Sequence, residues 1–415
     1  MIADAEAYTT LIQHLAELDA EHGTVLMVQV ENEVGLTGSS RDHSPAAETA
    51  FQGQVPAELV DRLHQEWDTL HPILRRSLEH FYEKKDSSSR AGTWTEVFGE
   101  AVETDELFMA FHYARYLEQI TAAGKRYYDI PMYTNAWLSS VDLDTTLVLP
   151  PILATAGGAL PGVYPSGGPV VGVLDIWQLF APSLDFISPD IYLHDYSKLY
   201  RHYLHRGQAL LIPEQRRDPS GLRRLWDAYG SCGALCAAPF GIDPPHSCME
   251  DVQRHLSLLN RVGPYILKLQ ADRTKGVGFY FDELPQGQAW NADVKSYQLG
   301  KWKVSICRHG LYVPTTTGHG LVVQLDEDRF LCVGAGYSAR FTLEGHVSGI
   351  ARVTEVEVAP KTGELVPRRQ LNGDETLHHS CVQMASLAII EPDAFDIAQS
   401  KRPEICEVEL WVAAD

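Results

Sequence analysis

The sequence has few basic residues, no paired cysteine pattern and no uninterrupted apolar stretch long enough to span a membrane. Its 34 lysines and arginines face 55 aspartates and glutamates, which gives a formal net charge of -21. This argues against a nucleic-acid partner, because phosphate backbones are bound by basic patches. The seven cysteines are an odd number, without the spacing of a disulfide framework or of a zinc site. We therefore expect buried free thiols and no metal site.

The chain also lacks a recognisable leader or membrane segment. Residues 1–6 are acidic, with no apolar core as a signal peptide would have. The apolar stretch at residues 147–163 is interrupted by Pro150, Pro151 and Pro161, which makes it a poor membrane span. The chain as written is expected to be soluble and cytoplasmic, without a membrane partner. Its oligomeric state is left open.

Residues 1–263 alternate apolar, strand-like runs with amphipathic helices. The strands are expected to end near residues 31, 134, 188, 213 and 239. The helices are expected at residues 5–21, 57–83, 104–123, 171–181, 195–206 and 219–229, with a linker at 84–92 and a long loop at 144–170. Strands that alternate with helices and end in polar residues are typical of a (β/α) barrel. We predict an incomplete TIM barrel with about five of the eight strands.

The pattern changes in residues 264–415, which form the second predicted domain. Short alternating runs separated by turn residues are expected at 278–281, 304–307, 320–325, 330–333, 351–358 and 407–412. Such runs are typical of an antiparallel β-sandwich.

Two glutamates each close an apolar run and are the candidate catalytic residues. Glu33 follows the run that begins at Val25, and Glu214 follows the run that begins at Ala209. In a parallel barrel the carboxyl ends of the strands meet at one mouth, and two carboxylates there can perform glycoside hydrolysis. We expect Arg216 and Arg217 to keep Glu214 ionised. The alternative is that both glutamates are ordinary strand-end or surface residues in ion pairs.

Four further residues are candidates for substrate binding. Asn32 can donate a hydrogen bond to a sugar hydroxyl, and Asn135 ends the second predicted strand together with Trp137. Trp137 can stack on the C–H face of a sugar ring. Tyr192 follows the third predicted strand and can donate to a nucleophilic carboxylate, although it can equally belong to the core. For Trp177 and Trp226, which lie on predicted helices, packing in the core is favoured.

Several motifs together resemble a known family. Residues 29–35 (QVENEVG) resemble the acid/base motif of the β-galactosidases of glycoside hydrolase family 35. More specific runs resemble a β-galactosidase-like subgroup with an uncharacterised C-terminal β domain. They are residues 41–48 (RDHSPAAE), 131–137 (PMYTNAW), 188–192 (SPDIY), 212–214 (IPE) and 369–376 (RQLNGDET).

The resemblance implies a function as well as a fold. It implies a retaining exo-β-glycosidase of carbohydrate metabolism, with a β-linked galactoside as substrate and no cofactor. Glu33 would be the acid/base and Glu214 the nucleophile, separated by roughly 5 Å, as retention requires.

The resemblance also implies a truncation. The acid/base residue of this clan ends the fourth barrel strand, whereas a single helix precedes Glu33. The first three strands are therefore expected to be missing, which leaves open sheet edges. Two alternatives follow: a catalytically inactive remnant that binds carbohydrate or a partner protein, or an incomplete gene.

Overall fold

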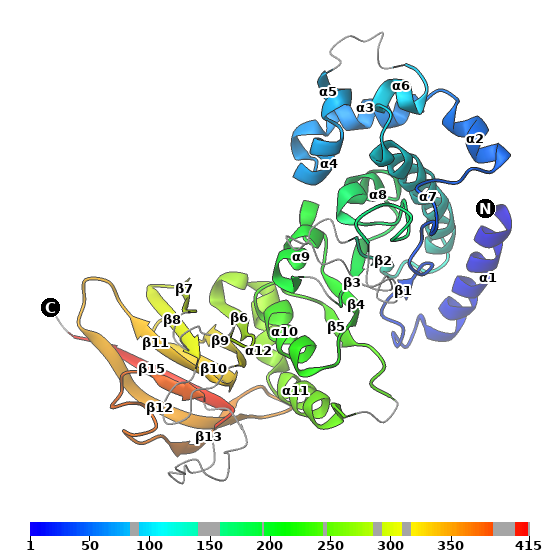
Figure 1. Ribbon diagram of the computed structural model, residues 1–415. Coiled ribbons are helices and arrows are strands. Elements are labelled where there is room, and N and C mark those ends of the chain that lie inside the picture. Colours follow the sequence, from blue (N-terminus) through cyan, green and yellow to red (C-terminus); the bar gives the residue numbers. More distant parts are fainter. Residues whose placement is uncertain are drawn as a thin grey trace. The chain divides into compact units, whose positions relative to one another are not determined.

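The computed structural model describes residues 1–83, 91–139, 158–192, 195–243, 247–284, 293–308, 317–384 and 403–413 (Figure 1). The chain forms two compact units, Met1–Glu214 and Gln215–Asp415. Most of the predicted linker at 84–92 and residues 144–157 of the predicted long loop lie outside the described residues.

The first unit is built on two long helices that pack against each other, α1 (Ile2–Asp19) and α7 (Val102–Lys125). Both were predicted from their periodicity. A Cβ at Gly124 of α7 would lie 2.5 Å from the Tyr8 ring, so glycine is needed where the helices meet. The unit also contains shorter helices, among them α2 (Pro45–Phe51), α6 (Trp94–Phe98), α8 (Leu174–Phe180) and α9 (Tyr196–Tyr203), with η4 (Val171–Val173) and η5 (His205–Gly207).

The single helix predicted over residues 57–83 is wrong. This segment forms α3 (Ala57–Gln65), η1 (Trp67–Thr69), α4 (Pro72–Ser77) and α5 (Glu79–Glu83). The cause is Pro72, which disfavours helical geometry in the preceding residue. His71 is accordingly non-helical (φ -56°, ψ 136°) and caps α4 through its side chain. The proline thus begins a new helix instead of continuing the old one.

A parallel sheet lies within the first unit. Its order is β1 (Val28–Gln29), β2 (Met132–Trp137), β3 (Phe186–Asp190), and both pairings are parallel. β1 is much shorter than the predicted strand. The fourth predicted strand corresponds to β4 (Leu211–Gln215). The described residues thus show short parallel strands among helices, and the incomplete barrel remains a prediction.

The register of this sheet decides which side chains share a face. Tyr133 pairs with Phe186, Asn135 with Ser188 and Trp137 with Asp190. Because alternate residues of a strand point to the same side, these three pairs line one face. The stacked rings of Tyr133 and Phe186, 5.3 Å apart, begin the row that ends at Trp137 and Asp190.

The second unit contains two antiparallel sheets (Figure 1). One has the order β13-β12-β15-β10-β9-β6 and the other β14-β11-β8-β7. Their strands are β6 (Gly276–Phe281), β7 (Lys295–Leu299), β8 (Trp302–Arg308), β9 (Gly318–Gln324), β10 (Arg329–Ala335), β11 (Tyr337–Thr342), β12 (Ser348–Val358), β13 (Leu365–Gln370), β14 (Val382–Met384) and β15 (Ile405–Val412).

The inner faces of these two sheets share one apolar core. Phe279, Phe330 and Val408 from the first sheet belong to the same buried cluster as Trp302 and Tyr337 from the second. This confirms the predicted sandwich-like arrangement. The six predicted strands correspond to β6, β8, β9, β10, β12 and β15, whereas β7, β11, β13 and β14 were not foreseen.

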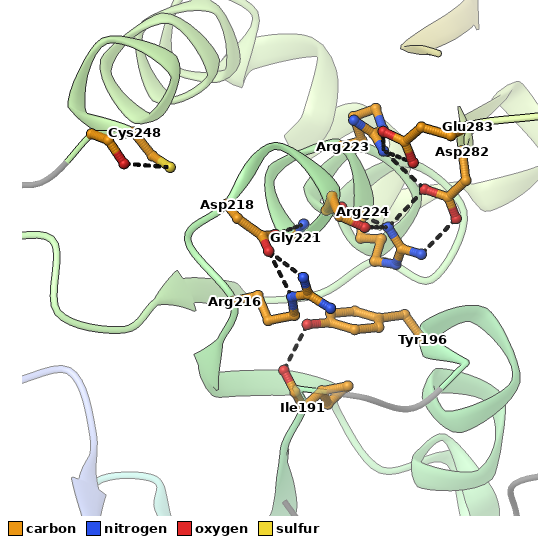
Figure 2. A network of polar contacts seen from close by, with 12 residues as sticks. Ile191, Tyr196, Arg216, Asp218, Gly221, Arg223, Arg224, Cys248, Asp282 and Glu283 are labelled. Atoms are coloured by element: carbon orange, nitrogen blue, oxygen red, sulfur yellow. Dashed lines mark hydrogen bonds and ion pairs between the residues drawn. The ribbon is translucent and has the colours of Figure 1, made fainter. Parts of the chain in front are cut away.

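Helices α10 (Pro219–Gly230), α11 (Met249–Arg261) and α12 (Gly263–Ala271) also belong to the second unit, with η6 (Arg273–Lys275) and β5 (Cys236–Pro239). α10 packs on β6, where a Cβ at Gly278 would lie 1.8 Å from the Trp226 carbonyl oxygen. Arg223 and Arg224 of α10 form ion pairs with Asp282, which follows β6 (Figure 2). Close backbone contact and ion pairs thus join this helix to the edge of the sheet.

The change from helices to antiparallel strands occurs between α12 and β6. The domain boundary after residue 263 was predicted from this change of pattern and remains a prediction, while the compact units divide at Glu214 and Gln215. All seven cysteines are free thiols. Cys232 is buried as expected, but Cys236 is exposed. Within the described ranges, no helix has both the length and the apolar character needed to cross a bilayer.

Candidate functional site

The candidate acid/base residue lies in a strained segment directly after β1. Glu31 and Glu33 have positive φ values of 60° and 46°. Residues other than glycine rarely adopt this region, and such strain persists only where surrounding contacts maintain it. The Glu33 N–H donates to Asn135 Oδ1 at 2.8 Å. Strand β2 therefore fixes the backbone that carries Glu33.

Asn135 is the centre of an amide network. Its Oδ1 also accepts from Gln29 Nε2 at 3.1 Å, and its Nδ2 donates to Asn32 Oδ1 at 3.0 Å and to Asp190 Oδ2 at 2.7 Å. The side chain is 1% exposed. Both amide hydrogens are thus used by protein partners. The geometry favours a role in positioning, whereas the sequence predicted a contact with substrate.

Asp190 is a component of the site that sequence reasoning did not single out. It ends β3, is 4% exposed, and shares the sheet face of Asn135 and Trp137. Burial, together with the negative charges of Glu214 and Glu33, raises the pKa of Asp190 to about 9. Its place in residues 188–192, two residues before Tyr192, was the available signal, but spacing alone does not reveal burial.

Glu33 has the electrostatic setting of a general acid. Partial burial raises its pKa, and the negative charge of Glu214 acts in the same direction. A hydrogen bond with Asp190 acts in the opposite direction and lowers the pKa. A carboxyl that keeps its proton towards neutral pH can donate it to a leaving oxygen. The same interactions place Glu33, Asp190 and Glu214 within electrostatic reach of one another.

Glu214, on β4, is held by the segment after β3. Tyr192 Oη donates to Glu214 Oε2 at 2.7 Å, and the Ile191 N–H donates to the Glu214 carbonyl oxygen at 2.8 Å. Tyr196 Oη donates to the Ile191 carbonyl oxygen at 2.7 Å and anchors this segment (Figure 2). Burial of Tyr192 raises the pKa of its phenol, and the hydrogen bond to Glu214 and the charge of that carboxylate act in the same direction, so the phenol stays a donor. The predicted partnership of Tyr192 with Glu214 is therefore present.

The expected arginine partners of Glu214 have other contacts. Arg216 Nε donates to Asp218 Oδ2 at 2.9 Å (Figure 2), and Arg217 donates to the Gly241 carbonyl oxygen. Asp218 in turn caps α10 by accepting from the Gly221 N–H at 2.9 Å. Arg216 thus contacts the residue that caps α10, and Arg217 contacts the segment after β5.

The aromatic candidates divide as the sequence suggested. Trp177 and Trp226 are completely buried, and their indole N–H groups donate within the chain, so both are core residues. Trp137 is half-buried at the end of β2. Its Nε1 is buried, and no hydrogen-bond partner for it exists among the described residues. Trp137 is thus the tryptophan that lies on the face of the candidate site.

Asn32 differs from Asn135 in its exposure. It is exposed, and its Oδ1 accepts from Asn135 and from Gln29 Nε2, the latter at 3.1 Å. Its own amide hydrogens are the part of the group that can donate to a ligand hydroxyl. In the described parts of the chain, no three His, Cys, Asp or Glu side chains are grouped as metal ligands.

Comparison with known protein families gives a match in the C-terminal half of the chain. A sequence model of a domain of unknown function (DUF5597) matches residues 252–383, from α11 to β14. No curated protein matches the chain. The matched segment falls in the region where the motifs led us to expect an uncharacterised β domain, and it covers less than half of the chain.

Proposed function

We propose that the chain is a retaining exo-β-glycosidase that hydrolyses β-linked galactosides, with Glu33 as acid/base and Glu214 as nucleophile. The observation that carries this proposal is the mutual influence of the Glu33, Asp190 and Glu214 carboxyls within one compact unit. Carboxyls in such an arrangement differ in proton affinity, which is what assigns acid and nucleophile in glycosidases.

The proposed reaction has two steps. Glu214 attacks the anomeric carbon while the glycosidic C–O bond breaks, and the proton of Glu33 passes to the leaving oxygen. Water then attacks the same carbon, its proton passes to the Glu33 carboxylate, and the bond to Glu214 breaks. The configuration is inverted twice and so retained. Retention places the two carboxyls roughly 5 Å apart.

The remaining residues have supporting roles in this proposal. Tyr192 orients the Glu214 carboxylate, and Asn135 fixes Glu33 through the backbone N–H of that residue. Trp137 offers a ring on which a sugar can stack, and Asn32 offers amide hydrogens. We place β1 to β4 in an incomplete (β/α) barrel, because the carboxyl ends of parallel barrel strands gather catalytic residues. No metal or cofactor takes part. Galactose as the sugar rests on the motif resemblance.

The test is hydrolysis of a panel of aryl β-glycosides by the purified chain and by the Glu33→Gln and Glu214→Gln variants. The β-galactoside should be hydrolysed fastest, with release of the β-anomer first as seen by NMR. Both variants should lose activity by at least about 10³-fold. Glu31→Gln, a substitution of the exposed glutamate two residues earlier, is the matched control and should retain activity.

A second candidate function is carbohydrate binding without hydrolysis. It is favoured by the short parallel sheet of the described residues, because an open sheet supplies only part of the walls of a sugar pocket. A folded sample that binds β-galactosides but fails to hydrolyse them would replace our proposal with this one.

A further inference from the structure

The candidate site contains one carboxyl more than the proposed reaction uses. Asp190 Oδ2 accepts a hydrogen bond from Asn135, and the Asp190 carboxyl also shares a hydrogen bond with Glu33. Asp190 Oδ1 is buried and has no partner of normal geometry among the described residues. A buried carboxylate oxygen without a donor is costly, whereas the same oxygen with a proton is itself a donor.

We propose that Asp190 is a neutral carboxyl throughout the reaction, a positioning residue whose O–H donates to Glu33. This proposal rests on the function proposed above. Asp190 would then be a hydrogen-bond donor because its position at the end of β3 buries it beside two other carboxyls.

Charge balance explains why a neutral Asp190 suits the reaction. Before the first step, Glu33 carries its proton and Glu214 is the single negative charge of the three carboxyls. After that step, Glu214 is a neutral ester and Glu33 is the single negative charge. A neutral Asp190 keeps the total at one charge in both states, and its O–H stabilises the Glu33 carboxylate when that group must act as base. An ionised Asp190 would add a second negative charge at a buried position.

The surroundings of Asp190 support a neutral state. The groups that act on it are Glu33 from the segment after β1, Glu214 from β4 and Asn135 from β2, and Asp190 itself acts on Tyr192. Two of these neighbours are carboxyls, and none of the four is a cation. Burial is the largest influence and acts in the same direction, and together these influences raise the pKa of Asp190 to about 9.

The first test needs no enzyme activity. A carboxyl whose pKa is raised by folding keeps a proton that the unfolded chain releases above about pH 4. The contribution of Asp190 to stability is therefore complete below pH 4 and is lost as the pH rises through about 9. Relative to the isosteric Asp190→Asn variant, the unfolding equilibrium constant of the wild type should rise by up to tenfold per pH unit between pH 5 and 8. Asp68→Asn, at an exposed aspartate, is the control and should follow the wild type.

Two outcomes would overturn the proposal. Wild-type and Asp190→Asn curves that run parallel, or a wild type that gains stability with pH relative to the variant, would mean that Asp190 is ionised. If the variant does not fold, carboxyl ¹³C NMR of the aspartate-labelled wild type decides. One aspartate should keep the chemical shift of a protonated acid at pH 7, and its absence would contradict the proposal.

The second test uses the pH profile of kcat/KM and separates this proposal from the proposed function. The asparagine amide is a neutral donor like a protonated Asp190. Asp190→Asn should therefore lose less than about tenfold in kcat/KM, and the acidic and basic limbs of its pH profile should stay at the same pH. Loss of an ionised Asp190 would instead move the basic limb to lower pH. If the wild type has no hydrolytic activity, the proposed function fails, while the unfolding and NMR measurements still decide the state of Asp190.

Discussion

Tyr192 Oη lies 2.7 Å from Glu214 Oε2, which joins the segment after β3 to the candidate nucleophile on β4. A phenol that donates to a carboxylate fixes the direction of its lone pairs and releases the hydrogen bond as the ester forms. We expect Tyr192→Phe to lower kcat/KM for an aryl β-galactoside by about 10- to 100-fold, the worth of a hydrogen bond to a charged group.

Tyr127→Phe, which removes the hydroxyl of an exposed tyrosine, is the control for this substitution and should retain activity. Thermal unfolding of both variants distinguishes a lost catalytic contact from a lost fold. An unchanged kcat/KM in folded Tyr192→Phe would contradict the role of this hydroxyl at the nucleophile.

Substitutions of the two asparagines of the amide network, Asn135 and Asn32, should differ in their effects on stability and on KM. Asn135→Ala removes partners from the Glu33 N–H and from Asp190 Oδ2 in a buried place. The free energy of unfolding should fall by about 2–3 kcal/mol, because buried polar groups are left unsatisfied. Asn32→Ala, at an exposed residue, should cost about 0.5 kcal/mol or less but raise KM for the galactoside.

Urea unfolding and steady-state kinetics on the same samples check this pair. A stable Asn135→Ala variant with a raised KM would restore the role in substrate binding that the sequence suggested. A large loss of stability in Asn32→Ala would mean that the network depends on both amides.

Much of the secondary structure could be predicted because local signals agree with the fold. The periodicity of residues 104–123 gave α7, and alternation after residue 276 gave the main strands of the sandwich. The break within residues 57–83 has a local cause, since Pro72 disfavours helical geometry in the residue before it. β13 was missed because its residues are mostly exposed and carry little apolar alternation.

From the sequence, a residue of the candidate site could be predicted only where it closes or follows a single strand-like run. Glu33, Glu214 and Tyr192 were predicted as site residues in this way. The importance of Asp190 and the positioning contacts of Asn135 depend on the register of β2 against β3, which brings residues more than fifty positions apart onto one face. Sequence position gives no access to that register, nor to the burial that sets the proton affinity of Asp190.

A histidine pair in the first unit should make its stability depend on pH. His71 Nδ1 accepts from the Ile73 N–H at 3.2 Å, so His71 Nε2 carries the proton and donates to His202 Nδ1 at 2.9 Å. His71 can therefore take up a further proton only at Nδ1, which would lose the hydrogen bond from the Ile73 N–H. Burial lowers the pKa of His71, and the neighbouring His202, His205 and Arg75 act in the same direction. Asp175 opposes them, and the pKa is about 4.

The direction of the pH dependence of stability follows from this lowered pKa. The unfolded chain binds a proton at His71 near pH 6.5, whereas the folded chain binds it only near pH 4. The contribution to stability is therefore complete above about pH 6.5 and is lost as the pH falls towards 4. Between pH 7 and 5 the free energy of unfolding should fall by about 1–2 kcal/mol more in the wild type than in His71→Asn, which keeps an acceptor that can cap α4.

Urea unfolding at several pH values measures this difference, with His14→Asn, at an exposed histidine of α1, as the matched control. The control should show the same pH dependence as the wild type, because His14 lies on the exposed side of its helix. A His71→Asn variant that loses stability towards acid as steeply as the wild type would show that His71 binds its proton equally in both states. The hydrogen bond from the Ile73 N–H would then not oppose protonation of His71, and the acid sensitivity of this unit would have to come from its carboxylates instead.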